Sequence, residues 1–179
     1  PEKQEDNMRI ADYIQDSIVD GPGLRFVLFT QGCPHRCEGC HNPQTHDFEG
    51  GKEMSTDEII KIMLSNPLTD GLTLSGGEPF SQPEECAVVA RAAKEHGLNV
   101  WAYSGWTFEE LLADERPAVR ELLELCDVLV DGPFILEQRS LTLKWRGSRN
   151  QRVIDVQKSL AAGEVILYND ISYDINIQF

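Results

Sequence analysis

Short apolar stretches alternate with amphipathic stretches along most of this chain, a pattern that predicts strands and helices in turn. The first strand is expected at residues 25–30, a β-branched and aromatic run that leads directly into a loop with three cysteines. Four later runs have the same character and are also expected to be strands. They cover residues 71–75, 98–103, 127–131 and 152–155.

Helices are indicated between these strands by capping residues that precede apolar positions at helical spacing. Capping boxes begin at Ser55 and Thr107, each with a glutamate three residues later. Pro83 begins another helix, and Gly97 ends it. The chain therefore consists of strand, loop and helix units in succession.

Strands that alternate with helices predict a mostly parallel sheet with right-handed crossovers, hence an α/β layered fold. A complete barrel of eight such units needs about 250 residues. This chain has 179 residues, so we expect an incomplete, open parallel β/α barrel of roughly five or six units. A single domain is expected over residues 8–179. The polar residues 1–7 are expected to be a disordered tail or an expression remnant.

Charge and hydropathy narrow the classes of function. The formal net charge is −14, which argues against binding to a nucleic-acid backbone. No run approaches the roughly 18 apolar residues needed to cross a bilayer, and residues 1–7 lack the apolar core of a signal peptide. We therefore expect a cytoplasmic protein with no nucleic-acid or membrane partner.

Three of the five cysteines, Cys33, Cys37 and Cys40, share one short loop. Five cysteines cannot all pair in disulfides, because the number is odd, and three of them are close together in the sequence. Both features favour metal chemistry over disulfides. Cys86 and Cys126 fall at positions typical of core thiols. No fourth cysteine lies near the loop, so a four-iron cluster held there would keep one iron open to another ligand.

A zinc site is the alternative interpretation of this loop. His35, His41 or His46 would complete a Cys₃His set, which structural zinc modules use. Such modules commonly pair two cysteine hooks from separate segments, whereas here the three thiols share one loop and no second hook follows. The spacing therefore favours an iron-sulfur cluster.

Two motifs together resemble a known family. The C-x-x-x-C-x-x-C loop after the first strand, with S-G-G-E-P after the second, resembles the radical S-adenosylmethionine (SAM) superfamily. Within it, residues 20–25, 31–33 and 41–44 are similar to the activating enzymes of glycyl-radical proteins. Residues 147–155 resemble the branch of that family whose partner is anaerobic ribonucleoside-triphosphate reductase. The match extends over residues 8–168.

The resemblance implies a site in which SAM binds the open iron through its amino and carboxylate groups. The implied metal ligands are Cys33, Cys37 and Cys40. The implied cofactor contacts are Gly39, Cys40, His41, Gly76, Gly77, Glu78 and Asp131. The paired glycines would let the backbone approach SAM, and Glu78 would bind its ammonium group. Asp131 is equally compatible with a helix-capping or turn role. Many superfamily members carry an aromatic residue where this chain has Gly39.

The resemblance also implies a reaction. A one-electron donor such as a flavodoxin or ferredoxin would reduce the cluster, SAM would be cleaved, and the 5′-deoxyadenosyl radical would remove a hydrogen atom from a glycine of the partner protein. The alternatives are activation of pyruvate formate-lyase or another glycyl-radical enzyme, a small-molecule substrate, and a non-catalytic zinc-stabilised binding module.

A basic stretch follows the fourth predicted strand in this otherwise acidic chain. It contains Arg139, Lys144, Arg146, Arg149 and Arg152, five of the 16 basic residues. One interpretation is a solvated loop, and the other is recognition of an anion or a partner, because arginine pairs well with carboxylates. Trp145 within the stretch fits either an anchor for a partner or inward packing.

Overall fold

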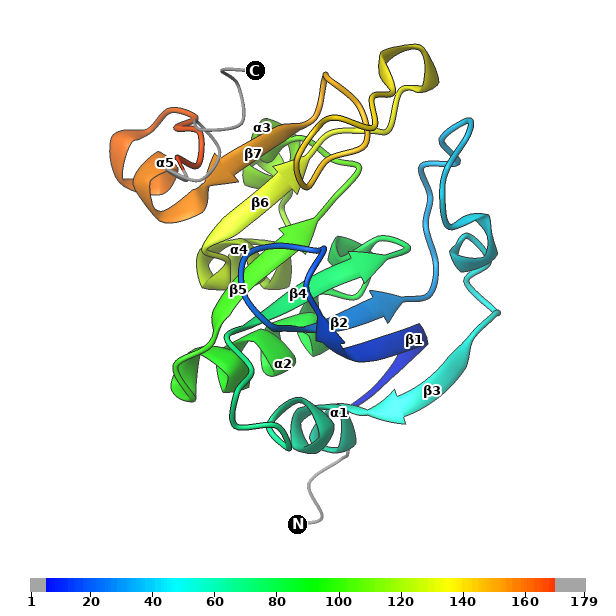
Figure 1. Cartoon of the computed structure of the whole chain (residues 1–179), viewed down its shortest axis with the longest axis vertical. Helices are drawn as coiled ribbons and strands as arrows, with labels where there is room; N and C mark the ends of the chain where they lie inside the picture. The colour runs from blue at the N-terminus through cyan, green and yellow to red at the C-terminus, as the bar shows by residue number, and fades with distance from the viewer. Residues whose placement is uncertain (1–5, 170–179) are drawn as a thin grey trace.

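A seven-stranded mixed sheet organises residues 6–169, the part of the chain that the computed structural model describes (Figure 1). The strand order is β3-β1-β2-β4-β5-β6-β7. The strands are β1 (Asn7–Ser17), β2 (Arg25–Thr30), β3 (Lys52–Ser55), β4 (Gly71–Gly76), β5 (Asn99–Tyr103), β6 (Val128–Asp131) and β7 (Arg152–Asp155). Strands β2, β4, β5 and β6 are parallel to one another, whereas β1, β3 and β7 pair antiparallel.

The helices confirm the predicted capping boxes. Ser55 Oγ accepts a hydrogen bond from the Glu58 amide and Thr107 Oγ1 accepts one from the Glu110 amide, both at 3.2 Å. The α-helices are α1 (Thr56–Met63), α2 (Pro83–Glu95), α3 (Phe108–Ala113), α4 (Pro117–Leu125) and α5 (Val156–Ala162), and the short 3₁₀ helices are η1 (Pro43–Thr45), η2 (Pro79–Ser81) and η3 (Leu136–Gln138). The helix expected between the strands at 98–103 and 127–131 is divided into α3 and α4, and α5 was not predicted. Within residues 6–169, no helix is long and apolar enough to cross a membrane.

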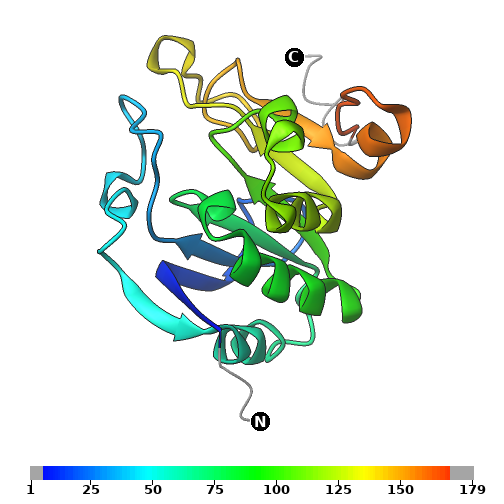
Figure 2. The ribbon, with the colours of Figure 1, turned by 180° about the vertical axis from the view of Figure 1, so that it is seen from behind.

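Alternation along the strands gives the sheet two different faces. Leu72, Leu74 and Val100 point into the main core, which helices α1, α2 and α4 cover (Figure 2). The neighbouring Trp101 points to the opposite face, where a smaller aromatic cluster includes Trp145. One face of the sheet is therefore packed against helices, and the other is covered by loops.

Arg25 is fully buried on the loop-covered face and ties the β1–β2 loop to the sheet. Its Nε donates to Thr73 Oγ1 at 2.7 Å, and its Nη1 donates to the Pro22 carbonyl oxygen at 2.9 Å. The guanidinium also lies over the ring of Trp101. Burial lowers the pKa of Arg25 to about 10, so the group stays charged at neutral pH. The loop that it holds continues into the site described below.

The sheet differs from the predicted one at both edges. The parallel part has four strands rather than the five or six β/α units expected, because β7 pairs antiparallel with β6. At the other edge, β1 and β3 were not predicted, and β1 returns directly into β2 through residues 18–24 without a crossover helix. Strand β7 is antiparallel because residues 132–151 stay at the carboxyl end of β6, and the chain re-enters the sheet from that end. Of the predicted tail, residues 1–5 lie outside the described part, while Asn7 already belongs to β1.

Candidate cofactor site

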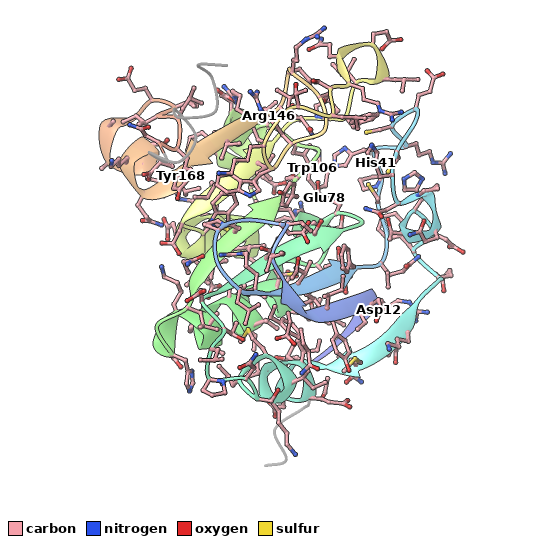
Figure 3. All side chains as sticks on the ribbon, in the orientation of Figure 1. Asp12, His41, Glu78, Trp106, Arg146 and Tyr168 are labelled. Carbon is pink, nitrogen blue, oxygen red and sulfur yellow. The ribbon has the colours of Figure 1, made fainter. Side chains whose placement is uncertain are left out.

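A cavity of about 400 Å³ lies at the carboxyl ends of the four parallel strands. Each strand or the loop after it contributes to the wall. The contributions are Cys33 after β2, Gly76 and Gly77 at the end of β4, Ser104 and Gly105 after β5, and Gly132 after β6. Figure 3 shows His41 and Trp106 at this end of the sheet. The cysteine loop and the Gly-Gly-Glu loop therefore meet at the same edge of the sheet.

All three loop cysteines line this cavity and are partly buried. Backbone hydrogen bonds hold the loop, with the Gly32 amide donating to the Thr45 carbonyl at 2.7 Å and the Cys40 amide donating to the Cys37 carbonyl at 3.2 Å. Burial raises the pKa of the Cys33 thiol to about 11. This thiol is therefore protonated at neutral pH in the absence of a metal, and metal binding must displace the proton.

Two of the histidines that a zinc site could use are engaged in other contacts. Among residues 6–169, no three His, Cys, Asp or Glu side chains are arranged to hold one metal ion. A structural zinc needs four ligands around one ion, whereas a four-iron cluster takes its thiolates on separate irons. His35 already bonds to Glu78, and the His41 ring packs edge-on against Phe134.

Gly76 and Gly77 bring the end of β4 into direct contact with the backbone that leads into the cysteine loop. A Cβ at Gly76 would lie 2.6 Å from the Thr30 nitrogen, and the Gly76 φ of +91° also favours glycine. A Cβ at Gly77 would lie 2.5 Å from the Gly32 carbonyl oxygen. A side chain at either position would push the two loops apart. Both glycines also line the cavity, as a backbone approach to a cofactor requires.

Glu78 is fully buried behind the cavity wall rather than in it. Its carboxylate accepts hydrogen bonds from the Phe80 amide and from three groups that belong to cavity-lining residues. Those three donors are His35 Nε2 at 2.7 Å, Ser104 Oγ at 2.7 Å and the Gly105 amide at 2.8 Å. The carboxylate therefore joins the cysteine loop to the loop after β5. Glu78 itself is not among the residues that line the cavity, so its contact with the ammonium group of SAM stays a prediction.

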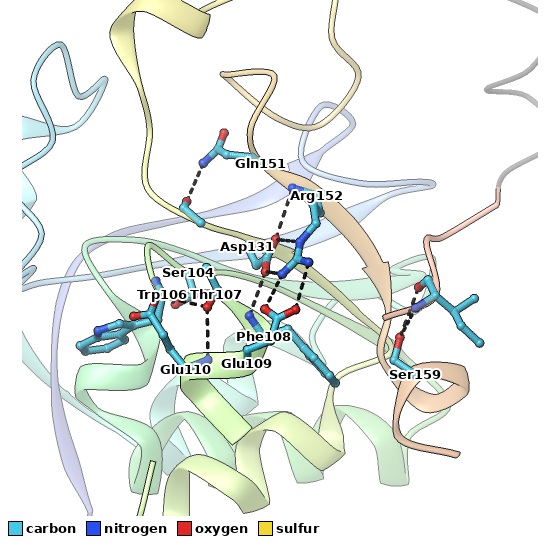
Figure 4. Close-up of polar contacts among 12 residues, drawn as sticks. Ser104, Trp106, Thr107, Phe108, Glu109, Glu110, Asp131, Gln151, Arg152 and Ser159 are labelled. Atoms are coloured by element: carbon cyan, nitrogen blue, oxygen red, sulfur yellow. Dashed lines mark hydrogen bonds and ion pairs between the residues drawn. The ribbon is translucent and has the colours of Figure 1, made fainter. Parts of the chain in front are cut away.

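Two more predicted contacts also lie outside the cavity lining. Gly39 packs against the segment after β6, since a Cβ there would lie 2.8 Å from Leu136 Cδ1. Asp131 is 1% exposed, accepts a hydrogen bond from the Phe108 amide at 2.8 Å and pairs with Arg152 at 2.6 Å (Figure 4). Asp131 thus has the helix-capping role that the sequence left open. His41 and Cys40 do line the cavity.

Several cavity residues escaped prediction from the sequence. They are Val19, Asp20, Tyr103, Phe134, Trp145 and Gln151, among others. Asp20 belongs to a motif that the family resemblance had marked, but its sequence was equally typical of a turn. Phe134 stands 3.5 Å from the position of a Gly39 Cβ, so an aromatic ring lies beside the place where superfamily members often carry one. Local spacing contained no signal for that contact.

A family model described as a 4Fe-4S single cluster domain matches residues 19–154. This span runs from the loop before β2 into β7. It therefore includes every residue of the cavity wall named above.

Curated relatives carry one name, anaerobic ribonucleoside-triphosphate reductase-activating protein. The relative from Salmonella typhimurium (strain LT2) is 37% identical over 154 residues, which cover 82% of this chain and 97% of its own. That from Vibrio cholerae is 39% identical over 152 residues, 80% of this chain and 96% of its own. The relative from Enterobacteria phage T4 is 36% identical over 144 residues, which cover 76% of this chain and 86% of its own. Among solved structures, QueE from Escherichia coli aligns with 56% of this chain and 54% of its own at a TM-score of 0.45 and 14% identity.

Proposed function

The chain belongs to the family of anaerobic ribonucleoside-triphosphate reductase-activating proteins, and we propose that it activates such a reductase by generating a radical on one of its glycines. When bound, a 4Fe-4S cluster and SAM supply the chemistry, in which one electron cleaves SAM to methionine and a 5′-deoxyadenosyl radical that takes a hydrogen atom from the glycine α-carbon. The chain supplies binding, orientation and exclusion of side reactions.

One observation carries this proposal. The three loop cysteines and the Gly76–Gly77 turn line the same cavity at the carboxyl ends of four parallel strands. In open α/β sheets this is the edge at which ligands bind. A cavity of about 400 Å³ is within the usual size range of small-molecule and cofactor sites.

The cavity wall suggests how the chain would hold its cofactors. Cys33, Cys37 and Cys40 would each bind one iron, which leaves the fourth iron open to SAM. The backbone at Gly76 and Gly77 approaches SAM closely because no side chain intervenes. On this proposal, the aromatic contact expected near Gly39 comes from Phe134, which His41 holds edge-on at a centroid distance of 5.3 Å.

The loop-covered face of the sheet gives a protein substrate access to the cavity. Val19 lines the cavity and is 72% exposed, so the mouth has an apolar, open rim there. In the described part of the chain, β3 and β7 are separate edges of the sheet. These separate edges support the proposal of an incomplete barrel, in which a glycine loop of the reductase can reach the site. The protein works in the cytoplasm with its reductase and receives electrons from a flavodoxin or ferredoxin.

Electron paramagnetic resonance tests the proposed function. Anaerobically reconstituted protein is reduced, mixed with SAM and the reductase, and frozen. We expect a glycyl-radical signal on the reductase that requires SAM and is lost in Cys37→Ala. Iron and sulfide contents are measured on the same samples.

The alternatives predict different outcomes of the same experiment. A radical on pyruvate formate-lyase without one on the reductase would contradict the proposed partner while keeping the chemistry. Stoichiometric zinc without iron or sulfide would contradict the radical chemistry and leave a binding module.

A further inference from the structure

The segment after β6 forms a positively charged arm beside the cavity. We propose that this basic arm, residues 132–151, is the docking surface for an acidic segment of the reductase that flanks its glycine loop. This inference rests on the proposed function and adds the chemistry by which the partner is recognised.

The basic arm contrasts in charge with the rest of the protein. It holds Arg139, Lys144, Arg146 and Arg149 and a single acidic residue, Glu137. Its net charge is therefore +3 in a chain of total charge −14, so the other residues carry −17. An acidic partner would be repelled by most of this surface and attracted at the arm. Such a charge pattern would fix the orientation of the bound partner as well as the place where it binds.

Hydrogen bonds hold the arm in a defined shape. Gln151 Nε2 donates to the Gly132 carbonyl at 3.1 Å, which closes the base of the arm. The Arg149 amide donates to the Gln138 carbonyl at 2.9 Å, and a bridge joins Arg139 to Ser148. The two sides of the arm therefore support each other. A preordered surface loses less entropy on binding than a flexible loop does.

Two arginines of the arm have no carboxylate partner among the described residues. Arg139 and Arg149 are exposed and take part in none of the ion pairs found within residues 6–169. In contrast, Arg116 and Arg120 on the helical side each pair with a carboxylate of their own neighbourhood. The guanidinium groups of Arg139 and Arg149 remain available to carboxylates of another protein, for which arginine is well suited.

The position of the arm connects it to the cavity. Phe134, Trp145 and Gly147 belong to the arm and also line the cavity wall. Figure 1 shows the arm, in yellow to orange, at the same end of the molecule as the cysteine loop. Leu141, near the tip of the arm, is 83% exposed. The arm thus forms part of the cavity wall, so an acidic flank bound by the arm would place the adjacent glycine beside the cavity.

Charge reversal tests the arm. Arg139→Glu with Arg149→Glu is compared with the matched control Lys61→Glu with Lys158→Glu, exposed residues of α1 and α5 that give the same net charge. The dissociation constant for the reductase is measured at low and moderate salt, alongside SAM cleavage without the reductase. We expect the arm variant to bind about 10-fold more weakly, with a reduced dependence on salt, and to cleave SAM normally.

The outcomes separate this inference from the function on which it rests. Equal weakening by both double variants, or unchanged affinity in the arm variant, would overturn the docking surface even while wild-type protein still forms the glycyl radical. If wild-type protein forms no radical on the reductase at all, the proposed function fails together with the inference. Arg139 and Arg149 are exposed, so circular dichroism should show both double variants folded.

Discussion

Glu78 and Asp131 both stand at the carboxyl ends of parallel strands, β4 and β6, and both are almost completely buried. The donors around them differ. Glu78 accepts hydrogen bonds from three groups of the cavity wall, whereas Asp131 binds the N-terminus of α3 and the side chain of Arg152 in the edge strand β7. Two carboxylates with the same burial at the same edge of the sheet therefore support different parts of the molecule.

A place at a strand end therefore does not by itself make a residue part of the site. The contacts of Glu78 belong to loops that hold the cysteines and line the cavity. A substitution of Glu78 should therefore alter the position of the bound cofactors. The contacts of Asp131 hold strand β7 and helix α3 in place. A substitution that removes these contacts should therefore mainly lower the free energy of unfolding. Substitutions of these two carboxylates and of their partners test this division.

Glu78→Gln should have the largest effect on activity. The amide nitrogen would face at least one hydrogen-bond donor, either at the Oε1 position beside His35 or at the Oε2 position beside Phe80. A buried conflict of this kind costs about 1–3 kcal/mol and moves the loop. We expect SAM cleavage per bound cluster to fall about 100-fold, since a misplacement of 1 Å has that scale of effect. Unchanged cleavage per cluster would contradict the coupling.

Gly105→Ala tests the same coupling through sterics alone. A Cβ at this position would lie 2.4 Å from the His35 ring, so the ring must leave Glu78. We expect SAM cleavage to fall about 10-fold and the spectrum of bound SAM to change.

His35→Ala should have a similar effect, and the two changes together should reduce SAM cleavage no more than either change alone, because both break the same interaction between His35 and Glu78. Fully additive effects would contradict this, and His35→Gln should recover part of the loss.

Arg152→Met tests the other carboxylate. The change keeps most of the side chain's apolar stem but leaves the buried Asp131 with backbone donors alone. Breaking a buried pair costs about 3–5 kcal/mol, and because the Arg152 side chain is 33% exposed we expect about 2 kcal/mol. Urea unfolding measures the loss. SAM cleavage per bound cluster should stay normal, and a fall as large as that of Glu78→Gln would place Asp131 in the site.

Local patterns in the sequence predicted most elements of the fold, and the reasons are visible at particular residues. Ser55 and Thr107 cap their helices within three residues, so the signal and the structure share one short segment. The partners of Glu78 at positions 104 and 105 lie 26 and 27 residues away, and those of Asp131 are similarly distant. No local spacing encodes such contacts. The same holds for Phe134 beside Gly39 and for the direction of β7.

Glu109→Gln should have the smallest effect on stability. It measures how much the exposed ion pair of Arg152 contributes beside the buried pair with Asp131. The hydrogen bond from Arg152 holds the pKa of the Glu109 carboxyl below its ordinary value. A lowered folded-state pKa stabilises the fold above the unfolded value, roughly pH 4.3, and this contribution disappears as the pH falls through the folded-state pKa. Because Glu109 is 59% exposed, the contribution should stay below about 1 kcal/mol at pH 7.

Urea unfolding of wild-type and Glu109→Gln proteins between pH 7 and pH 3 measures this contribution. The difference in unfolding free energy should shrink as the pH falls and should also shrink in high salt, because exposed pairs are screened. A difference that grows on acidification would contradict the lowered pKa of Glu109. A loss at pH 7 as large as that of Arg152→Met would instead make Glu109, rather than the buried Asp131, the main anchor of Arg152. We expect Arg152→Met to lower the free energy of unfolding more than Glu109→Gln does. That result would mean that the ion pair with the buried Asp131, rather than the pair with Glu109, stabilises the β7 edge of the sheet.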